Sequence, residues 1–279
     1  MLLMEYVRQY LDSRDVSAGY RAQVKSAILA MEKFTGHPLS LADLSVDLLN
    51  RYLSTTRSSL SPETRKHRRA VCLTIWRAAA DDELVPAPRE RKVMRVRVPE
   101  KLHTAWSPEQ VRQLLTAADQ LRGRIFQNGV DQGRYWRSYV MAAWDSGLRG
   151  CDLRQLRRED ITARGLVVLI QQKTGRRLLS QFRMETVDAI EATYPPDRPA
   201  IWAICGGLRL WRDHARRLVA RAGLTGGIGR LRHSSGTAVE LLHPGRGHEH
   251  LGNTRRVFEQ HYLDHDRAFV AKPMPERLV

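Results

Sequence analysis

One short stretch with strand character interrupts a chain whose hydrophobic pattern is otherwise helical, and this contrast limits the folds available to it. Residues 166–172 read LVVLIQQ, residues 173–177 read KTGRR and residues 178–182 read LLSQF. The two apolar runs have strand length, and Gly175 supplies the conformational freedom of a hairpin turn. A single hairpin among helices predicts a mainly α fold with a small antiparallel β-sheet, in the α+β class.

Helix-start signals recur along the rest of the chain. Ser61-Pro62 and Ser107-Pro108 each place an N-cap residue before a proline at the first helical position. One predicted helix ends at Gly147, a residue type that commonly closes helices. The spacing of apolar residues predicts helices over residues 4–14, 17–34, 134–146, 185–193, 209–222, 232–242 and 254–261, with further ones beginning near residues 43, 61 and 107.

The length and the distribution of charge predict two domains. The chain has 279 residues, and a domain holds roughly 150 residues. Residues 87–104 contain Pro88 and Pro99, with six basic and two acidic side chains. We therefore expect a helical domain over residues 1–86, a basic linker over 87–104 and a second domain over 105–279. Partial alternation of valine and arginine in the linker also fits one edge strand.

The net charge indicates a polyanionic partner. Lys and Arg number 46 against 30 Asp and Glu, for a formal charge of +16, and the sequence pI is near 10.4. Such a balance favours nucleic acid, because cations release counterions from phosphates. A genome that favours arginine codons explains the same composition. Basic candidates for contact with DNA are Arg65, Lys66, Arg68, Arg69, Arg95, Arg97, Arg176 and Arg177. For the run at residues 65–69, a solvated helix face explains the charges equally well.

Composition excludes several other classes of protein. The chain is 42% hydrophobic and 27% charged, which is typical of a folded protein rather than a disordered or collagen-like one. No apolar run approaches the roughly 20 residues that a membrane span needs, and the N-terminus lacks an apolar core of signal-peptide length. Three cysteines without a CxxC pair argue against a disulfide framework or a zinc site, so we expect a reducing cytoplasm.

Four motifs in the second half of the chain contain residue types suited to catalysis. The run SGLRGCDL places Arg149 after a helix-ending glycine, with Asp152 three residues on, within reach of its guanidinium. Lys173 lies in the hairpin turn and can donate a proton, which arginine cannot. Arg232 opens a helix and so makes an anion site. The run HLGN precedes Tyr262, which attacks well only among cations, because its ordinary pKa is near 10.

Together these motifs resemble the tyrosine recombinase (phage integrase) family. The order Arg, Lys, Arg-His, Leu-Gly-x, Tyr is the catalytic order of that family. SGLRGCDLRQLRREDI resembles its first arginine box, QQKTGRR its lysine hairpin, RLRHSSGTA its second arginine box, and HLGN with the following tyrosine its third. Residues 104–265 carry the resemblance in detail, and residues 1–86 resemble the helical core-binding (SAM-like) domain of the family. The resemblance implies a two-domain DNA clamp.

The resemblance also implies a role for each matching residue. Tyr262 would attack a DNA phosphodiester and form a 3′-phosphotyrosyl bond. Arg149 and Arg232 would hold the non-bridging oxygens, and Lys173 would protonate the leaving 5′ oxygen. Asp152 and His233 would support the site, and Asn253 stands at a catalytic position of the third box. Neither a cofactor nor a metal is implied. The partners would be double-stranded DNA and further copies of the chain, as a homotetramer on two duplexes and a monomer or dimer off DNA.

Two positions depart from the family pattern. The second box usually reads His-x-x-Arg, and here its first position is Gly229. The third box usually has His or Trp where this chain has Asn253, and the segment between residues 240 and 251 is short. Loss of a general acid–base group typically costs about 10²–10⁴ in rate, although His233, His248, His250 and His261 are nearby in the sequence. A recombinase-derived DNA-binding protein without catalysis is therefore the main alternative. A topoisomerase of type IB is a third.

Overall fold

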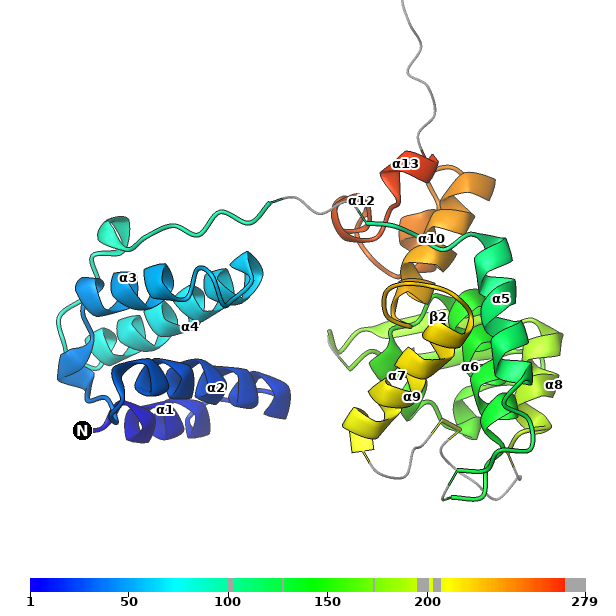
Figure 1. Ribbon diagram of the computed structural model, residues 1–279, viewed down its shortest axis with the longest axis horizontal. Helices are drawn as coiled ribbons and strands as arrows, with labels where there is room; N and C mark the ends of the chain where they lie inside the picture. Colours follow the sequence, from blue (N-terminus) through cyan, green and yellow to red (C-terminus); the bar gives the residue numbers. More distant parts are fainter. Residues whose placement is uncertain (100–102, 127, 173, 195–200, 203–206, 269–279) are drawn as a thin grey trace, which may run out of the picture. The chain divides into compact units, whose positions relative to one another are not determined.

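The computed structural model describes residues 1–99, 103–126, 128–172, 174–194, 201–202 and 207–268. Contacts divide the chain into two compact units, residues 1–101 and 102–279. The fold is mainly helical with one small antiparallel sheet, which confirms the predicted class (Figure 1). Among the described residues, no helix combines the length and the apolar character that crossing a membrane requires.

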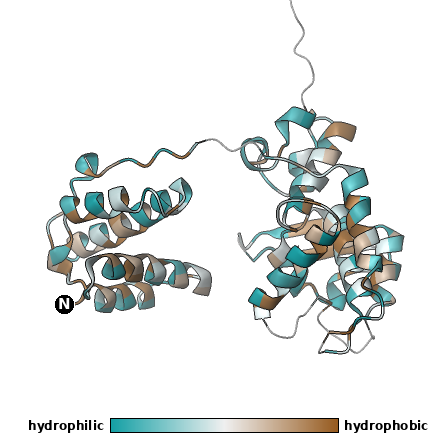
Figure 2. Ribbon diagram, viewed as in Figure 1, coloured by the Kyte–Doolittle hydropathy of each residue, from teal (hydrophilic) through white to brown (hydrophobic). Residues whose placement is uncertain are grey.

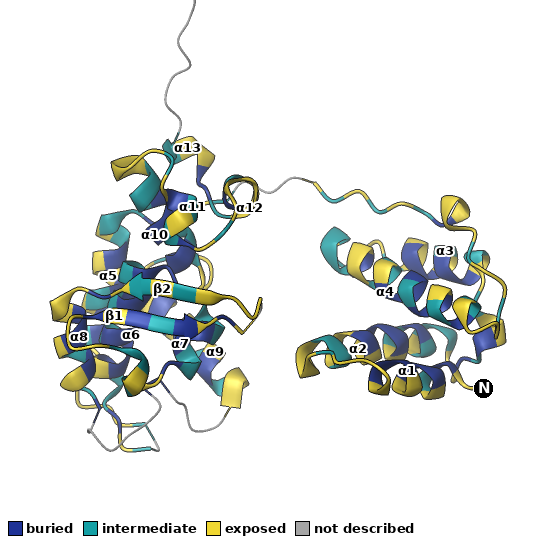
Figure 3. Ribbon diagram, turned by 180° about the vertical axis from the view of Figure 1, so that it is seen from behind, coloured by how far each residue is buried: buried dark blue, intermediate teal, exposed yellow. Residues whose placement is uncertain are grey.

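The first unit is built from four helices. They are α1 (Leu3–Asp12), α2 (Ala18–Thr35), α3 (Val46–Thr55) and α4 (Pro62–Asp81), with 3₁₀ turns at Leu41–Asp43 and Glu90–Lys92. Each helix turns its apolar side toward its neighbours and its polar side outward (Figures 2 and 3). The α4 helix begins as predicted, with Pro62 at its first turn and the Ser61 side chain accepting a hydrogen bond from the Thr64 N–H.

The first part of the expected linker packs on this unit. Val93 is buried in its core, and Asn50 holds the segment by donating to the Lys92 carbonyl at 3.1 Å and accepting from the Met94 N–H at 2.7 Å. Residues 93–99 form no strand, so the alternation of valine and arginine reflects packing on the first unit. Residues 100–102 of the expected linker lie outside the described residues.

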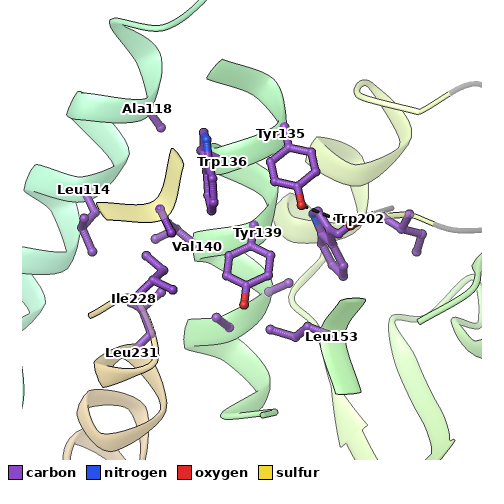
Figure 4. Close-up of a cluster of buried hydrophobic side chains, with 14 of the residues drawn as sticks. Leu114, Ala118, Tyr135, Trp136, Tyr139, Val140, Leu153, Trp202, Ile228 and Leu231 are labelled. Atoms are coloured by element: carbon purple, nitrogen blue, oxygen red, sulfur yellow. Dashed lines mark hydrogen bonds between the residues drawn. The ribbon is translucent and has the colours of Figure 1, made fainter. Parts of the chain in front are cut away.

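The second unit surrounds one buried helix. This helix is α6 (Gln132–Ser146), and α5 (Pro108–Asp119), α8 (Met184–Glu191) and α10 (Arg230–Leu242) pack against it. Figure 4 shows Tyr135, Trp136 and Tyr139 of α6 among the side chains of its neighbours. The polar tips of the aromatic residues are satisfied internally, because Tyr135 donates to the Trp202 carbonyl and accepts from the Trp211 indole. The remaining helices are α7 (Gly150–Gln155), α9 (Gly207–Arg221), α11 (Gly247–His250), α12 (Arg255–His261) and α13 (His265–Ala268), with a 3₁₀ turn at Arg158–Asp160.

The predicted hairpin forms the sheet. Strand β1 (Leu166–Ile170) pairs antiparallel with β2 (Arg177–Gln181), and the register puts Leu166 opposite Gln181 and Ile170 opposite Arg177. Val167 and Leu169 alternate inward from β1 into the core. The residues between the strands, 171–176, overlap the predicted turn at residues 173–177, although β1 ends two residues earlier and β2 begins one residue earlier than the sequence predicts. Gly175 lies in the left-handed region at φ +64°.

Candidate active site

The Arg149 side chain is positioned by the end of α6. Gly147 closes the helix in the left-handed conformation, with φ +58°, which glycine adopts without steric cost. A Cβ at this position would also clash with Cδ2 of the buried Leu251 side chain. Residue 147 must therefore be glycine for two reasons, and the turn it makes places Arg149 directly before α7.

Arg149 contacts the third box more closely than it contacts Asp152. Its Nη2 donates to Asn253 Oδ1 at 3.2 Å, whereas its Nη1 lies 3.9 Å from Asp152 Oδ2. Asp152 is fully buried, and its Oδ1 accepts the Gln172 N–H at 3.0 Å. The carboxylate predicted to fix Arg149 therefore also holds the chain directly before Lys173, at the start of the hairpin turn.

Arg232 is buried and tied to two main-chain carbonyls. It lies in the first turn of α10 and is only 5% exposed. One guanidinium nitrogen donates to the Gly147 carbonyl, and the other donates to the Leu251 carbonyl at 2.8 Å. Because Gly147 and Arg149 are two residues apart, the positions of the two arginines are linked through the main chain rather than through flexible side chains.

Tyr262 lies beside both arginines. It follows the last residue of α12 and is half-buried. The centre of its ring is 4.8 Å from Arg232 Cζ and 5.0 Å from the His233 ring centre. Burial, the largest single influence, raises the pKa of its phenol, but Arg232 and Arg149 together outweigh it, so the pKa lies below its ordinary value. This environment favours the phenolate, the reactive form of a tyrosine nucleophile.

Several buried hydrogen-bond donors at this site have no partner among the described residues. They are Arg149 Nη1, Arg232 Nε, Asn253 Nδ2 and Gln171 Nε2. An unsatisfied buried donor costs about 1–3 kcal/mol, and more for a charged group, so such a group in a native structure calls for an explanation. Donors on two arginines and two amides, next to a tyrosine with a lowered pKa, suit an anion with several oxygens.

Gly229 leaves open space at the position where the family pattern has histidine. It lies at the start of α10 with φ −61° and ψ −16°, and no heavy atom lies within 4 Å of a Cβ built there. Neither the backbone nor the packing therefore requires glycine. Histidine occurs elsewhere instead. His250 Nε2 pairs with Ser235 Oγ at 2.6 Å, and His233 packs on Tyr262.

The remaining predicted residues are distributed as follows. Lys173 lies outside the described residues. Arg176 and Arg177 are exposed on the hairpin, as are Lys66, Arg95 and Arg97 in the first unit. Arg65, by contrast, is buried, and its Nε donates to the Leu53 carbonyl at 2.9 Å. Arg68 donates to the Tyr52 hydroxyl, and Arg69 to the Met94 carbonyl. These three arginines make contacts inside the first unit.

The sequence interpretation omitted two residues of the site. Gln171 is buried at the end of β1, where Thr174 Oγ1 donates to its Oε1 at 2.7 Å. His103 precedes α5, and its ring stacks on His233 with the centres 5.3 Å apart. A polar residue at the end of an apolar strand is a weak signal for Gln171. No signal in the sequence marks His103, because it contacts the site only through the fold.

In the described residues, no cluster of three or more His, Cys, Asp or Glu side chains is arranged to bind a metal ion.

No family model and no curated protein matches the sequence. Solved structures do match. A lambda integrase fragment, a dimer bound to a COC′ core site, is 17% identical, with a TM-score of 0.75 over 99% of this chain and 100% of that one.

Two further structures match at a TM-score of 0.65. The XerH recombinase bound to a difH substrate is 16% identical over 94% of this chain and 82% of its own. The Tn1549 transposon integrase, in complex with circular intermediate DNA, is 12% identical over 98% and 96%. The chain therefore has the fold of the tyrosine recombinases, and the resemblance inferred from the motif order is confirmed at the level of the fold.

Proposed function

We propose that this protein is a site-specific DNA recombinase that cuts and rejoins DNA through a covalent 3′-phosphotyrosine. The observation that carries the proposal is the position of Tyr262. Its phenol has a lowered pKa beside Arg149 and Arg232, and both arginines have buried donors without a hydrogen-bond partner among the described residues. A phosphodiester satisfies those donors and offers Tyr262 an electrophile.

The reaction follows from these positions. The Tyr262 oxygen attacks phosphorus, the bond from phosphorus to the 5′ oxygen breaks, and the 3′ phosphate stays on the tyrosine. Arg149 and Arg232 neutralise the charge that grows on the non-bridging oxygens. We assign Lys173 to the proton that the departing 5′ oxygen takes up. Attack of a 5′ hydroxyl on the phosphotyrosine reverses these steps, so rejoining needs no external energy source.

The amide of Asn253 has a double role in this scheme. Its Oδ1 accepts from Arg149 and so orients that guanidinium, and its buried Nδ2 remains available to a phosphate oxygen. An amide donates as an imidazole does, although it does not exchange a proton at neutral pH. We therefore propose that Asn253 retains the hydrogen-bonding part of the role that the usual residue at this position plays.

The partners we propose are double-stranded DNA and further copies of the chain. Of the structures that share this fold, lambda integrase is described as a dimer on a core site and as a tetramer on a Holliday junction. Exposed basic side chains suited to the DNA backbone are Lys66, Arg95, Arg97, Arg176 and Arg177. Phosphate contacts of this kind position a protein on DNA but do not read its sequence.

The test is covalent trapping on nicked duplexes. The purified protein is incubated with nicked duplexes tiled across the DNA that flanks its own gene, and the products are separated on denaturing gels. A nick near the cleavage site lets the strand beyond it diffuse away, so the adduct accumulates. We expect an adduct with the wild type and none with Tyr262→Phe. An adduct that persists in Tyr262→Phe would refute the proposal.

A second candidate function rests on Gly229. Without an imidazole there, the site lacks the group that handles the tyrosine proton in the family pattern, which fits a DNA-binding protein without catalysis. That alternative predicts site-selective, salt-dependent binding to one of the duplexes with no adduct at any pH. An adduct through Tyr262 excludes it.

A further inference from the structure

Three aromatic rings lie in a row at the candidate nucleophile. The His103 and His233 rings stack at 5.3 Å with an interplanar angle of 25°, and the His233 and Tyr262 rings are 5.0 Å apart at 38°. His261 meets the outer ring edge-on at 6.3 Å. The rings come from three separate segments: the residues before α5, helix α10 and the end of α12. We infer that His233 is a positioning residue that orients the Tyr262 phenol, and that His103 supports His233 on the face away from Tyr262. This inference rests on the proposed function.

Tyr262 needs such a neighbour because of its place in the chain. Its main-chain N–H closes α12 by donating to the Phe258 carbonyl at 2.9 Å, and its backbone leaves the helical conformation at φ −131° and ψ −31°. The phenol therefore projects from a turn rather than from a helix interior. Its attack on phosphorus requires one ring orientation, and about 1 Å of misplacement costs on the order of 10²-fold in rate.

Helix α10 supplies two adjacent side chains to this ring. Arg232 is fixed by the carbonyls of Gly147 and Leu251, and His233 follows it directly. The guanidinium provides the charge, and the imidazole provides a flat surface against the phenol ring. The same turn of the same helix therefore fixes both the electrostatics and the orientation of the nucleophile.

The segment that carries His103 is hydrogen-bonded both to α10 and to the residues that follow Tyr262. The Ala105 N–H donates to Asp264 Oδ2 at 2.7 Å, and the Trp106 N–H donates to Ser234 Oγ at 2.7 Å. Asp264 is two residues beyond Tyr262, and its own N–H donates to Thr237 Oγ1 of α10 at 3.1 Å. His103 is thus held against α10 and against the chain that follows the nucleophile.

The surroundings of His233 keep its imidazole neutral. The groups that face it are His103 from the segment before α5, Arg230 and Arg232 from its own helix, and the Tyr262 main chain from the end of α12, of which only the last raises its pKa. Burial first, and then His103, Arg232 and Arg230, lower the pKa of His233 to about 4. A neutral imidazole packs on the phenol at neutral pH without competing with the arginines for a negatively charged phosphate.

The test compares removal of the ring with retention of a ring. On the duplex that traps the wild type, His233→Ala should slow adduct formation by about 10–100-fold at saturating DNA, with the affinity for DNA unchanged within twofold. His233→Phe should recover most of the lost rate, because it restores the flat surface. His37→Ala, an exposed histidine of the first unit, is the matched control. A rate for His233→Ala within twofold of the wild type would overturn the inference, and so would a phenylalanine variant as slow as the alanine variant.

A second pair of variants and a second readout cover misfolding of His233→Ala. His103→Ala should slow the reaction about threefold to tenfold, a smaller effect because it acts through His233, and His103→Phe should restore it. In the full chain labelled with 3-fluorotyrosine, the Tyr262 signal is assigned with Tyr262→Phe. This signal should broaden or split in the two alanine variants and stay single in the two phenylalanine variants. An unchanged signal in all four contradicts positioning, whether or not the wild type forms an adduct, whereas a missing wild-type adduct tests only the proposed function.

Discussion

Both units of the chain bury arginines, but they use them differently. In the first unit, the Nε of Arg65 donates to the Leu53 carbonyl and that of Arg69 to the Met94 carbonyl. In the second unit, Arg232 is buried to a similar degree as Arg65, yet its Nε has no hydrogen-bond partner among the described residues, and neither has Nη1 of Arg149. Burial and positive charge are common to the two regions. What differs is the donor that the fold leaves unused, and we take that difference as the mark of a binding site.

The largest effect we expect comes from replacing Arg149, one of the two arginines of the second unit that have a donor without a hydrogen-bond partner among the described residues. Arg149→Ala should slow adduct formation by about 10²–10³-fold, the usual result of removing one transition-state donor. The free energy of unfolding should change by less than about 1 kcal/mol, because the variant also removes an unsatisfied charged group. Single-turnover kinetics on the nicked duplex and denaturant unfolding measure the two quantities. A large loss of stability with little loss of rate would show that Arg149 has a structural role, like the arginines of the first unit.

Substitutions of Gly229 test whether the candidate active site lacks a general acid–base group. Gly229→His should raise the rate of adduct formation about tenfold or more, within the range of a general acid–base group, because a Cβ there meets open space. Gly229→Ala is the matched control, since it makes the same change in the backbone without an imidazole. Equal rates for the histidine and alanine variants would show that this position no longer takes part in the chemistry.

Arg65 tests the first unit's side of the comparison. Arg65→Met keeps much of the side-chain volume but leaves the Leu53 carbonyl without its donor. We expect the free energy of unfolding to fall by about 1–3 kcal/mol. The dependence of DNA affinity on salt should keep its slope, because a buried arginine neutralises no phosphate. A slope reduced by about one unit would show that Arg65 contacts a DNA phosphate.

The smallest effect concerns pH and arises in the second unit. Burial first, and then Arg232, lower the pKa of His250 to about 4 from 6.5, so the unfolded chain takes up a proton that the folded chain excludes. Stability from this group is therefore complete above pH 6.5 and falls as the pH drops toward 4. Unfolding in denaturant at pH 7.5, 5.5 and 4.5 measures the fall. His250→Gln should make it smaller and leave the part due to His233, whose pKa is lowered in the same way. An equal fall in the variant would assign the loss to other groups.

Local sequence signals predicted the fold well where elements are long enough to show a period. The hairpin, the capped start of α4 and the glycine that ends α6 all appear where the sequence puts them. Helices α7 and α11 were not predicted, because six and four residues hold too little of a helical repeat to be recognised. One consequence is that Asp152, for which the sequence indicated no helix, lies in α7.

The site was predictable in its residues but not in its contacts. Motif order brought Arg149, Arg232, Asn253 and Tyr262 forward as one group, and the structure gathers these four. Sequence spacing suggested Asp152 as the close partner of Arg149, whereas the hydrogen bond goes to Asn253, more than 100 positions away. Such a partner depends on how α6 and α11 pack, which local pattern does not encode. For the same reason, the basic run of α4 did not reveal that Arg65 reaches back to Leu53.

The two carbonyls bound by Arg232 have a consequence for how a protein of this kind decays. This one side chain fastens the end of α6 to the end of α11, so its loss would loosen three segments of the chain at once. Tyr262 carries no comparable structural duty, and a phenylalanine would fill its place. On the proposed function, a descendant that no longer cuts DNA can therefore lose the tyrosine at little cost to the fold while the arginine persists. When copies of such a gene are compared, a retained arginine then indicates that the fold survives, whereas the tyrosine indicates whether the strand cutting proposed for it is still under selection.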